Sequence, residues 1–130
     1  MLVIRKKQME DFQQQAERDF VDSVVKQLRS DHAAAVKDIP EDKLVKRVEY
    51  GIRRAREYGL TWKNNLSTFV TLMFEIAPGF DRFPAFQKHL ADERFPPDRR
   101  MSTLLEEMKV VDYQAIHENS DLTNWPAEML

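Results

Sequence analysis

The residues best suited to chemistry in this 130-residue chain are His89, Asp92 and Glu93. On a helix, positions three and four residues apart share a face, so this spacing groups an imidazole with two carboxylates. Such a group can supply two metal ligands, or a base with the acid that orients it. No third or fourth ligand follows at a recognisable spacing, and there is no His-Glu-x-x-His motif.

We therefore interpret His89 as a surface histidine near a helix C-terminus, where its charge interacts favourably with the helix dipole. A small metal-dependent hydrolase centred on His89 is the enzymatic alternative. Our expectation is a protein that is not an enzyme, with no catalytic residue, no bound metal and no cofactor.

Composition excludes several further classes of site. The chain has no cysteine, which excludes a disulfide scaffold, a thiolate zinc site and a cysteine nucleophile. Its three glycines leave nothing for a glycine-rich phosphate loop. The 20 basic and 22 acidic residues give a net charge of −2, which argues against a dedicated nucleic-acid or membrane-surface protein.

The first candidate binding surface is one basic edge of a helix predicted to end at Tyr58. This edge contains no acidic residue and consists of Lys43, Arg47, Tyr50 and Arg54. It could bind phosphate, RNA or an acidic protein surface. The alternative, which we favour, is a solvated border whose long side chains cover the core. On the opposite side, alternating charges are typical of a solvent-exposed helix face: Asp42, Lys46, Glu49, Arg53 and Glu57.

The second candidate surface is the acidic C-terminal region. Residues 101–130 contain one lysine and six acids, whereas residues 1–100 carry a net charge of +3. Acidic residues with exposed aromatics suit a basic partner surface, because charge steers the encounter and the aromatics anchor it. The alternative is a partly disordered tail that keeps the protein soluble. The candidate residues are Glu106, Glu107, Asp112, Tyr113, Glu118, Asp121 and Trp125.

Helical periodicity predicts the elements that must position these residues. We expect one all-α domain over residues 1–110, with a tail over 111–130 that is docked or partly disordered. About five helices are predicted, at about 5–30, 40–58, 62–77, 83–92 and from 98 onward. The third is apolar over more than half of its circumference, which is typical of the central helix of a bundle. The first carries an apolar stripe at Met9, Phe12, Ala16, Phe20, Val24 and Leu28.

Local signals mark the ends of these helices. Asp38, Thr61 and Asp98 are each expected to cap the helix that follows them, and Gly59 suits the left-handed position after a helix C-terminus. Gly51 lies on an inward face and predicts a close approach by a neighbouring helix. Between residues 31 and 37 the first helix either continues or gives way to a short second piece.

No apolar run reaches the roughly 18 residues that a membrane span requires, and the N-terminus lacks a signal-peptide pattern. We therefore expect a cytoplasmic protein. Neither observation names a partner, and a homodimer is compatible with the sequence.

Four groups of residues resemble a pattern found in small helical bacterial proteins encoded beside type VI secretion effector and spike components. They are Arg5-x-x-Gln8-Met9-x-x-Phe12, Gly51-Ile52-x-Arg54-Ala55-x-x-Tyr58-Gly59, Phe69-Val70-x-Leu72-Met73-Phe74 and Ala77-Pro78-Gly79-Phe80-Asp81-x-x-Pro84. The resemblance covers about residues 5–105 and leaves the acidic tail outside. The group has no catalytic motif to carry over to this chain.

What the resemblance implies is a small cytoplasmic partner of a secreted toxin. As an immunity protein, it would bind the cognate toxin and neutralise it. As an effector-loading adaptor or chaperone, it would bind the effector without neutralising it. Nucleic acid is expected to be an unlikely ligand and a membrane is not expected as a partner.

Overall fold

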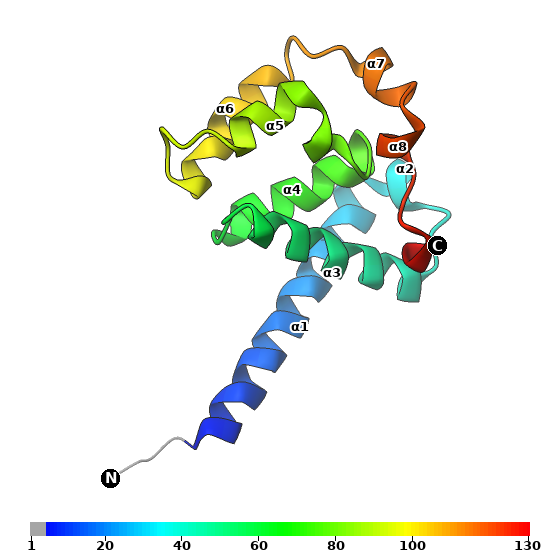
Figure 1. The fold of residues 1–130 in the computed structure, drawn as a ribbon. Helices are drawn as coiled ribbons and strands as arrows, with labels where there is room; N and C mark the ends of the chain where they lie inside the picture. The colour runs from blue at the N-terminus through cyan, green and yellow to red at the C-terminus, as the bar shows by residue number, and fades with distance from the viewer. Residues whose placement is uncertain (1–4) are drawn as a thin grey trace.

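The computed structural model describes residues 5–130, and in this part of the chain every regular element is helical (Figure 1). The all-α class is confirmed, but eight α-helices are present where about five were expected. The difference comes from three pieces of four or five residues, which are too short to show a period in the sequence. The helices are α1 (Lys6–Asp31), α2 (Ala33–Val36), α3 (Glu41–Glu57), α4 (Lys63–Glu75), α5 (Pro84–Leu90), α6 (Arg100–Glu107), α7 (Tyr113–His117) and α8 (Ser120–Thr123).

Helix α1 is divided into a packed half and a free half. Its buried residues are Phe20, Val21, Val24, Val25 and Leu28, whereas every side chain from residue 5 to residue 16 is exposed. Figure 1 shows this N-terminal half projecting from the body. The expectation of one continuous buried stripe is therefore wrong for Met9, Phe12 and Ala16, which are all exposed, Met9 by 42% and Phe12 by 71%. No element of the described chain reaches far enough to cover them.

Helices α3 and α4 form the closest pair in the body. A methyl group added at Gly51 would lie 3.0 Å from both Val70 Cγ2 and Met73 Sδ, which confirms the predicted close approach. Helix α3 ends at Gly59, whose φ of 90° is the expected left-handed conformation. Its N-cap is Pro40 rather than Asp38, which lies in the preceding turn and makes no capping bond.

The N-terminus of α4 is capped from a distant part of the chain. Asp98 accepts hydrogen bonds from the main-chain amides of Thr61 and Trp62, at 3.0 Å each, and from the Thr61 hydroxyl. Thr61 was expected to cap this helix and Asp98 to cap the helix after it; neither is observed. The loop before α6, with the 3-10 helix η2 (Pro97–Arg99), brings the carboxylate to α4 instead.

The core continues from α4 into α5 and α6, and it is rich in aromatic rings. The ring centres of Phe69 and Phe80 are 5.0 Å apart, and those of Phe80 and Phe86 are 5.6 Å apart. Phe80 belongs to the 3-10 helix η1 (Phe80–Arg82). Leu90, Met101 and Leu104 complete this layer and are buried. Edge-to-face and tilted pairs of this kind stabilise a core beyond the area that they bury.

The C-terminal segment folds back along the body. After α7 and α8, the 3-10 helix η3 (Ala127–Met129) ends beside the N-terminal end of α3 (Figure 1). Ile116 and Leu122 anchor the segment because both are buried in the core. Within residues 5–130, no helix has the length and apolar character to cross a membrane.

Candidate functional site

The two surfaces selected from the sequence meet each other in the structure. The basic edge of α3 contacts the C-terminal segment through main-chain oxygens: Lys43 Nζ donates to Leu130, and Arg47 Nε donates to Met129 at 3.0 Å. Partial burial lowers the pKa of the Arg47 guanidinium. These two cations therefore bind the C-terminal segment of the same chain.

Trp125 anchors the contact by packing among three side chains. Its ring centre lies 6.3 Å from that of Tyr50 and 5.1 Å from that of Phe74. The Arg47 guanidinium carbon lies 5.1 Å from the same ring centre, within the range of a cation–π interaction. Trp125 is half-buried in this position. The aromatic that was expected to anchor an external partner thus already holds the segment against the body.

Two further hydrogen bonds fasten the segment near α8. Arg82 Nη2 donates to the main-chain oxygen of Asp121 at 2.6 Å, and the Gly79 amide donates to that of Leu122 at 2.7 Å. Both acceptors are peptide oxygens, so docking of the segment leaves the Asp121 carboxylate unused.

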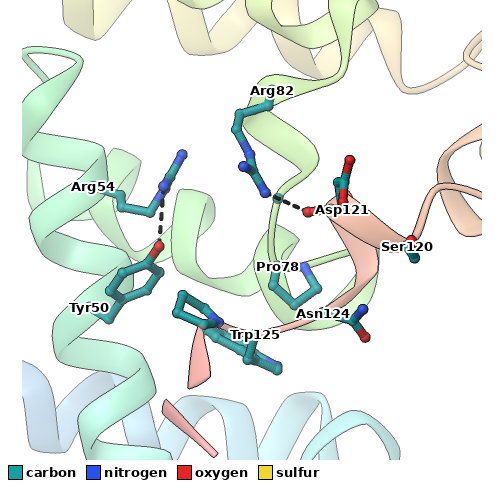
Figure 2. A pocket seen from close by; sticks show the side chains of 10 residues that line it. Tyr50, Arg54, Pro78, Arg82, Ser120, Asp121, Asn124 and Trp125 are labelled. Atoms are coloured by element: carbon teal, nitrogen blue, oxygen red, sulfur yellow. Dashed lines mark hydrogen bonds between the residues drawn. The ribbon is translucent and has the colours of Figure 1, made fainter. Parts of the chain in front are cut away.

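A cavity of about 290 Å³ lies between α3, the loop after α4 and the C-terminal segment (Figure 2). Its lining is mostly polar or aromatic and includes Tyr50, Arg54, Arg82, Ser120, Asp121 and Trp125. The Tyr50 hydroxyl accepts a hydrogen bond from Arg54 Nη1 at 3.2 Å. The docked segment therefore forms one wall of this cavity, and the end of the basic edge forms the other.

Arg54 is already committed to a charge inside the protein. Asp81 is fully buried, and its Oδ2 accepts hydrogen bonds from Arg54 Nη2 and from the Tyr58 hydroxyl, the latter at 2.7 Å. Burial alone would lower the pKa of Arg54, but the hydrogen bond and charge of Asp81 raise it above its ordinary value. Burial and the hydrogen bond that the Tyr58 hydroxyl donates to Asp81 raise the pKa of Tyr58. Arg54 therefore stabilises a buried carboxylate, which leaves less of its charge for an external anion.

The acidic candidates near α6 also have local partners. Glu106 pairs with Lys109 at 2.9 Å, and Glu107 pairs with Lys88 at 2.8 Å. The bond from Lys88 holds the pKa of Glu107 below its ordinary value. These two carboxylates are thus partly neutralised where they lie.

The candidates in the C-terminal segment differ in their roles. Asp112 caps α7 by accepting from the Ala115 amide at 3.2 Å, and the Tyr113 hydroxyl donates to the Met108 carbonyl at 2.7 Å. Three carboxylates remain outward and exposed, with no cation of the described chain within 4.0 Å, and we call them the outward carboxylates: Glu118, Asp121 and Glu128.

The helix face expected to group His89 with Asp92 and Glu93 does not exist, because α5 ends at Leu90. Asp92 instead pairs with Arg94 at 2.8 Å, and this bond lowers the pKa of Asp92 to about 2. His89 Nε2 lies 3.6 Å from Glu107 Oε1. In the part of the chain that the structure describes, no group of three or more His, Asp or Glu residues is placed to hold a metal ion.

Sequence reasoning did not find the bonding partners of three residues: Asp81, Arg82 and Asp98. Each bonds to a segment more than 20 residues away, so no local spacing marks its role. An available signal for Asp81 is its place between Phe80 and Phe83, since an acid among large apolar residues suggests a buried, paired carboxylate.

Comparison of the chain with protein-family profiles, with curated proteins and with solved structures found no match. A functional interpretation therefore depends on the site geometry described above and on the resemblance stated for residues 5–105.

Proposed function

We propose that this chain is a non-enzymatic protein-binding module that recognises a basic surface on another protein through its C-terminal segment. The observation that carries the proposal is how this segment is held. Main-chain oxygens accept the hydrogen bonds of Lys43, Arg47 and Arg82, while the outward carboxylates remain exposed to solvent and form no ion pair with a described cation, Glu118 accepting one hydrogen bond from Gln114.

The docked segment is well suited to electrostatic recognition. Residues 111–130 contain four acids and neither lysine nor arginine, so their field has a single sign. Such a field steers a basic partner and raises its association rate. Anchoring by Trp125 reduces the conformational entropy that a disordered acidic tail would lose on binding.

We propose that the partner is a toxic type VI secretion effector, and that the protein acts in the cytoplasm as its immunity protein. The resemblance of residues 5–105 supports this class of partner. Toxins that act on nucleotides or nucleic acids tend to have basic active sites, which the outward carboxylates could cover. The adaptor or chaperone function uses the same surface without neutralising the effector.

Co-expression with the proposed toxic effector tests the proposal. An immunity protein restores growth of cells that produce the toxin, whereas an adaptor co-purifies with the toxin and leaves it active. The triple variant Glu118→Gln, Asp121→Asn, Glu128→Gln should lose rescue or binding while keeping the fold.

A matched control distinguishes the effect of removing charge from the C-terminal segment from the effect of removing the same charge elsewhere on the protein. The variant Glu49→Gln, Glu57→Gln, Glu93→Gln also removes three exposed carboxylates that form no ion pair with described residues. It should rescue growth as well as the wild type does. Equal behaviour of the two triple variants would overturn the proposed surface.

A further inference from the structure

The N-terminal half of α1 is a helix without a covering surface. All side chains of residues 5–16, which we call the arm, are exposed, and the arm stands clear of the body in Figure 1. The arm continues a helix whose other half is packed, so its turns need no new nucleus, but they gain no stability from tertiary contacts. Contacts with another surface would therefore add stability that the arm lacks in the single chain.

The arm carries an apolar stripe suited to packing against another helix. Met9, Phe12 and Ala16 follow the spacing of a helix–helix seam, and Phe12 is 71% exposed. The stripe leads into a cavity of about 300 Å³ at the base of the arm, lined in part by Phe12, Ala16, Phe20 and Leu66. An apolar side chain from a second helix would thus find both a stripe and a hollow.

The two ends of the arm differ in charge. Three cations lie at its tip, Arg5, Lys6 and Lys7, whereas Glu17, Arg18 and Asp19 lie where it joins the body. Glu17 is bound by Arg56 at 2.8 and 3.0 Å, while Asp19 is exposed and forms no ion pair with a described cation. A parallel second arm would set two tips of three cations each side by side, whereas an antiparallel arm would place each tip beside Asp19 of the other copy.

Three residues spaced at equal intervals along α1, counted from its N-cap Arg5, define a register for such a pair. Arg5, Phe12 and Asp19 are seven residues apart, so they share one edge of the helix. In an antiparallel pair related by a two-fold axis, the same edges of the two helices meet. An axis at Phe12 then sets the two Phe12 rings together and each Arg5 beside Asp19 of the other copy.

We propose that the arm binds the arm of a second copy of this chain, antiparallel and centred on Phe12, and so forms a homodimer. The apolar stripe supplies the contact, and the two Arg5–Asp19 pairs select the orientation. This interface uses neither the outward carboxylates nor the docked C-terminal segment. A test of the dimer is therefore independent of a test of the proposed function.

Sedimentation equilibrium of the full chain tests the dimer. The wild type should show twice its 15.4 kDa mass, and Phe12→Glu should be monomeric with an unchanged melting transition of the body. Val110→Glu is the matched control, because Val110 is 78% exposed away from the arm; this variant should remain dimeric. A monomeric wild type at the highest attainable concentration would overturn the proposal, and so would a dimer that Phe12→Glu leaves intact.

Charge reversal tests the orientation. Arg5→Glu and Asp19→Arg should each raise the dimer dissociation constant about tenfold, because two attractive pairs become repulsive. The double variant should restore it to within about twofold of the wild type. Additive weakening in the double variant would overturn the antiparallel register. If the wild type is monomeric and Phe12→Glu loses only effector binding, the arm belongs to the effector and the homodimer is contradicted.

Discussion

The guanidinium carbon of Arg47 lies 5.1 Å from the centre of the Trp125 ring. This contact joins a basic helix edge to an acidic C-terminal segment, two surfaces that the sequence offers as separate binding sites. Their association inside one chain removes the basic edge as a free surface. It also fixes the segment that carries the outward carboxylates, on which the proposed function depends.

Replacing Trp125 by alanine should release the C-terminal segment. Truncating a fully buried tryptophan to alanine lowers the free energy of unfolding by about 3–5 kcal/mol. Because Trp125 is half-buried, we expect a loss of about 2 kcal/mol. Urea unfolding would measure this loss, and limited proteolysis should cut the variant within residues 118–130 much faster than the wild type.

The other tryptophan provides the control for this experiment. Trp62 is 54% exposed at the N-terminus of α4, so Trp62→Ala should cost about 0.5 kcal/mol and leave the proteolysis pattern unchanged. If both variants release the C-terminal segment equally, Trp125 does not anchor it.

Removing the carboxylate of Asp81 should be severely destabilising. Asp81→Asn leaves the half-buried Arg54 charge without its counter-charge, which should cost about 3 kcal/mol. Tyr58→Phe removes one hydrogen bond to the same carboxylate and should cost about 1.5 kcal/mol. Urea unfolding of the combined Asp81→Asn, Arg54→Met variant should give a loss smaller than the sum of the single losses. A strictly additive result would contradict the coupling.

Asp98 should make stability depend on pH in the acid range. Burial alone would raise its pKa, but hydrogen bonds from Thr61, Asn65 and the Trp62 amide lower it to about 2. Since the unfolded carboxyl has a pKa of about 3.9, the stabilisation is complete above about pH 4 and is lost as pH falls toward 2. An NMR titration of the Asp98 carboxyl would measure the low pKa directly.

The variant Asp98→Ala tests the cap on α4. It should lower the free energy of unfolding by about 1–2 kcal/mol at pH 7. The difference in unfolding free energy between variant and wild type, measured in urea, should decrease between pH 4 and pH 2. A difference that stays constant over this range would show that the ionised carboxylate is not what stabilises α4.

Adding a methyl group at Gly51 should destabilise the α3–α4 pair. Alanine is favoured over glycine by about 1 kcal/mol in helix propensity. The added carbon, however, lies 3.0 Å from Val70 Cγ2 and from Met73 Sδ, and overpacking of this kind costs about 1–3 kcal/mol. We expect a net loss of about 1 kcal/mol. Combining Gly51→Ala with Val70→Ala should cost less than the sum of the two changes, as thermal or urea unfolding would show.

The main helices could be predicted from the sequence because their signals are local. The apolar circumference of α4, the left-handed Gly59 and the close approach at Gly51 all follow from short-range periodicity or from the lack of a side chain. Helix α1 was predicted to within one residue at each end. Its exposed half was not predicted, because Met9 and Phe12 belong to the same apolar stripe as the buried Val24 and Leu28. Periodicity identifies an apolar face, but it does not say whether another element covers that face.

The candidate site was only partly predictable for a related reason. The residues of the basic edge and Trp125 were all identified, but the bonds between the two regions run to main-chain oxygens of Met129 and Leu130. Every residue has a main-chain oxygen, so bonds to these oxygens leave no trace in the sequence. Asp98 likewise acts on a helix that begins 35 residues before it, which no local capping rule can detect.

Calorimetric titration of the purified proposed effector with this protein is the most direct test of the central claim. We predict saturable binding that weakens as salt is raised and that falls at least tenfold in the Glu118→Gln, Asp121→Asn, Glu128→Gln variant. The Glu49→Gln, Glu57→Gln, Glu93→Gln control should bind as the wild type does. Binding of equal strength by all three proteins would contradict recognition through the C-terminal segment, and no binding by the wild type would contradict the proposed partner.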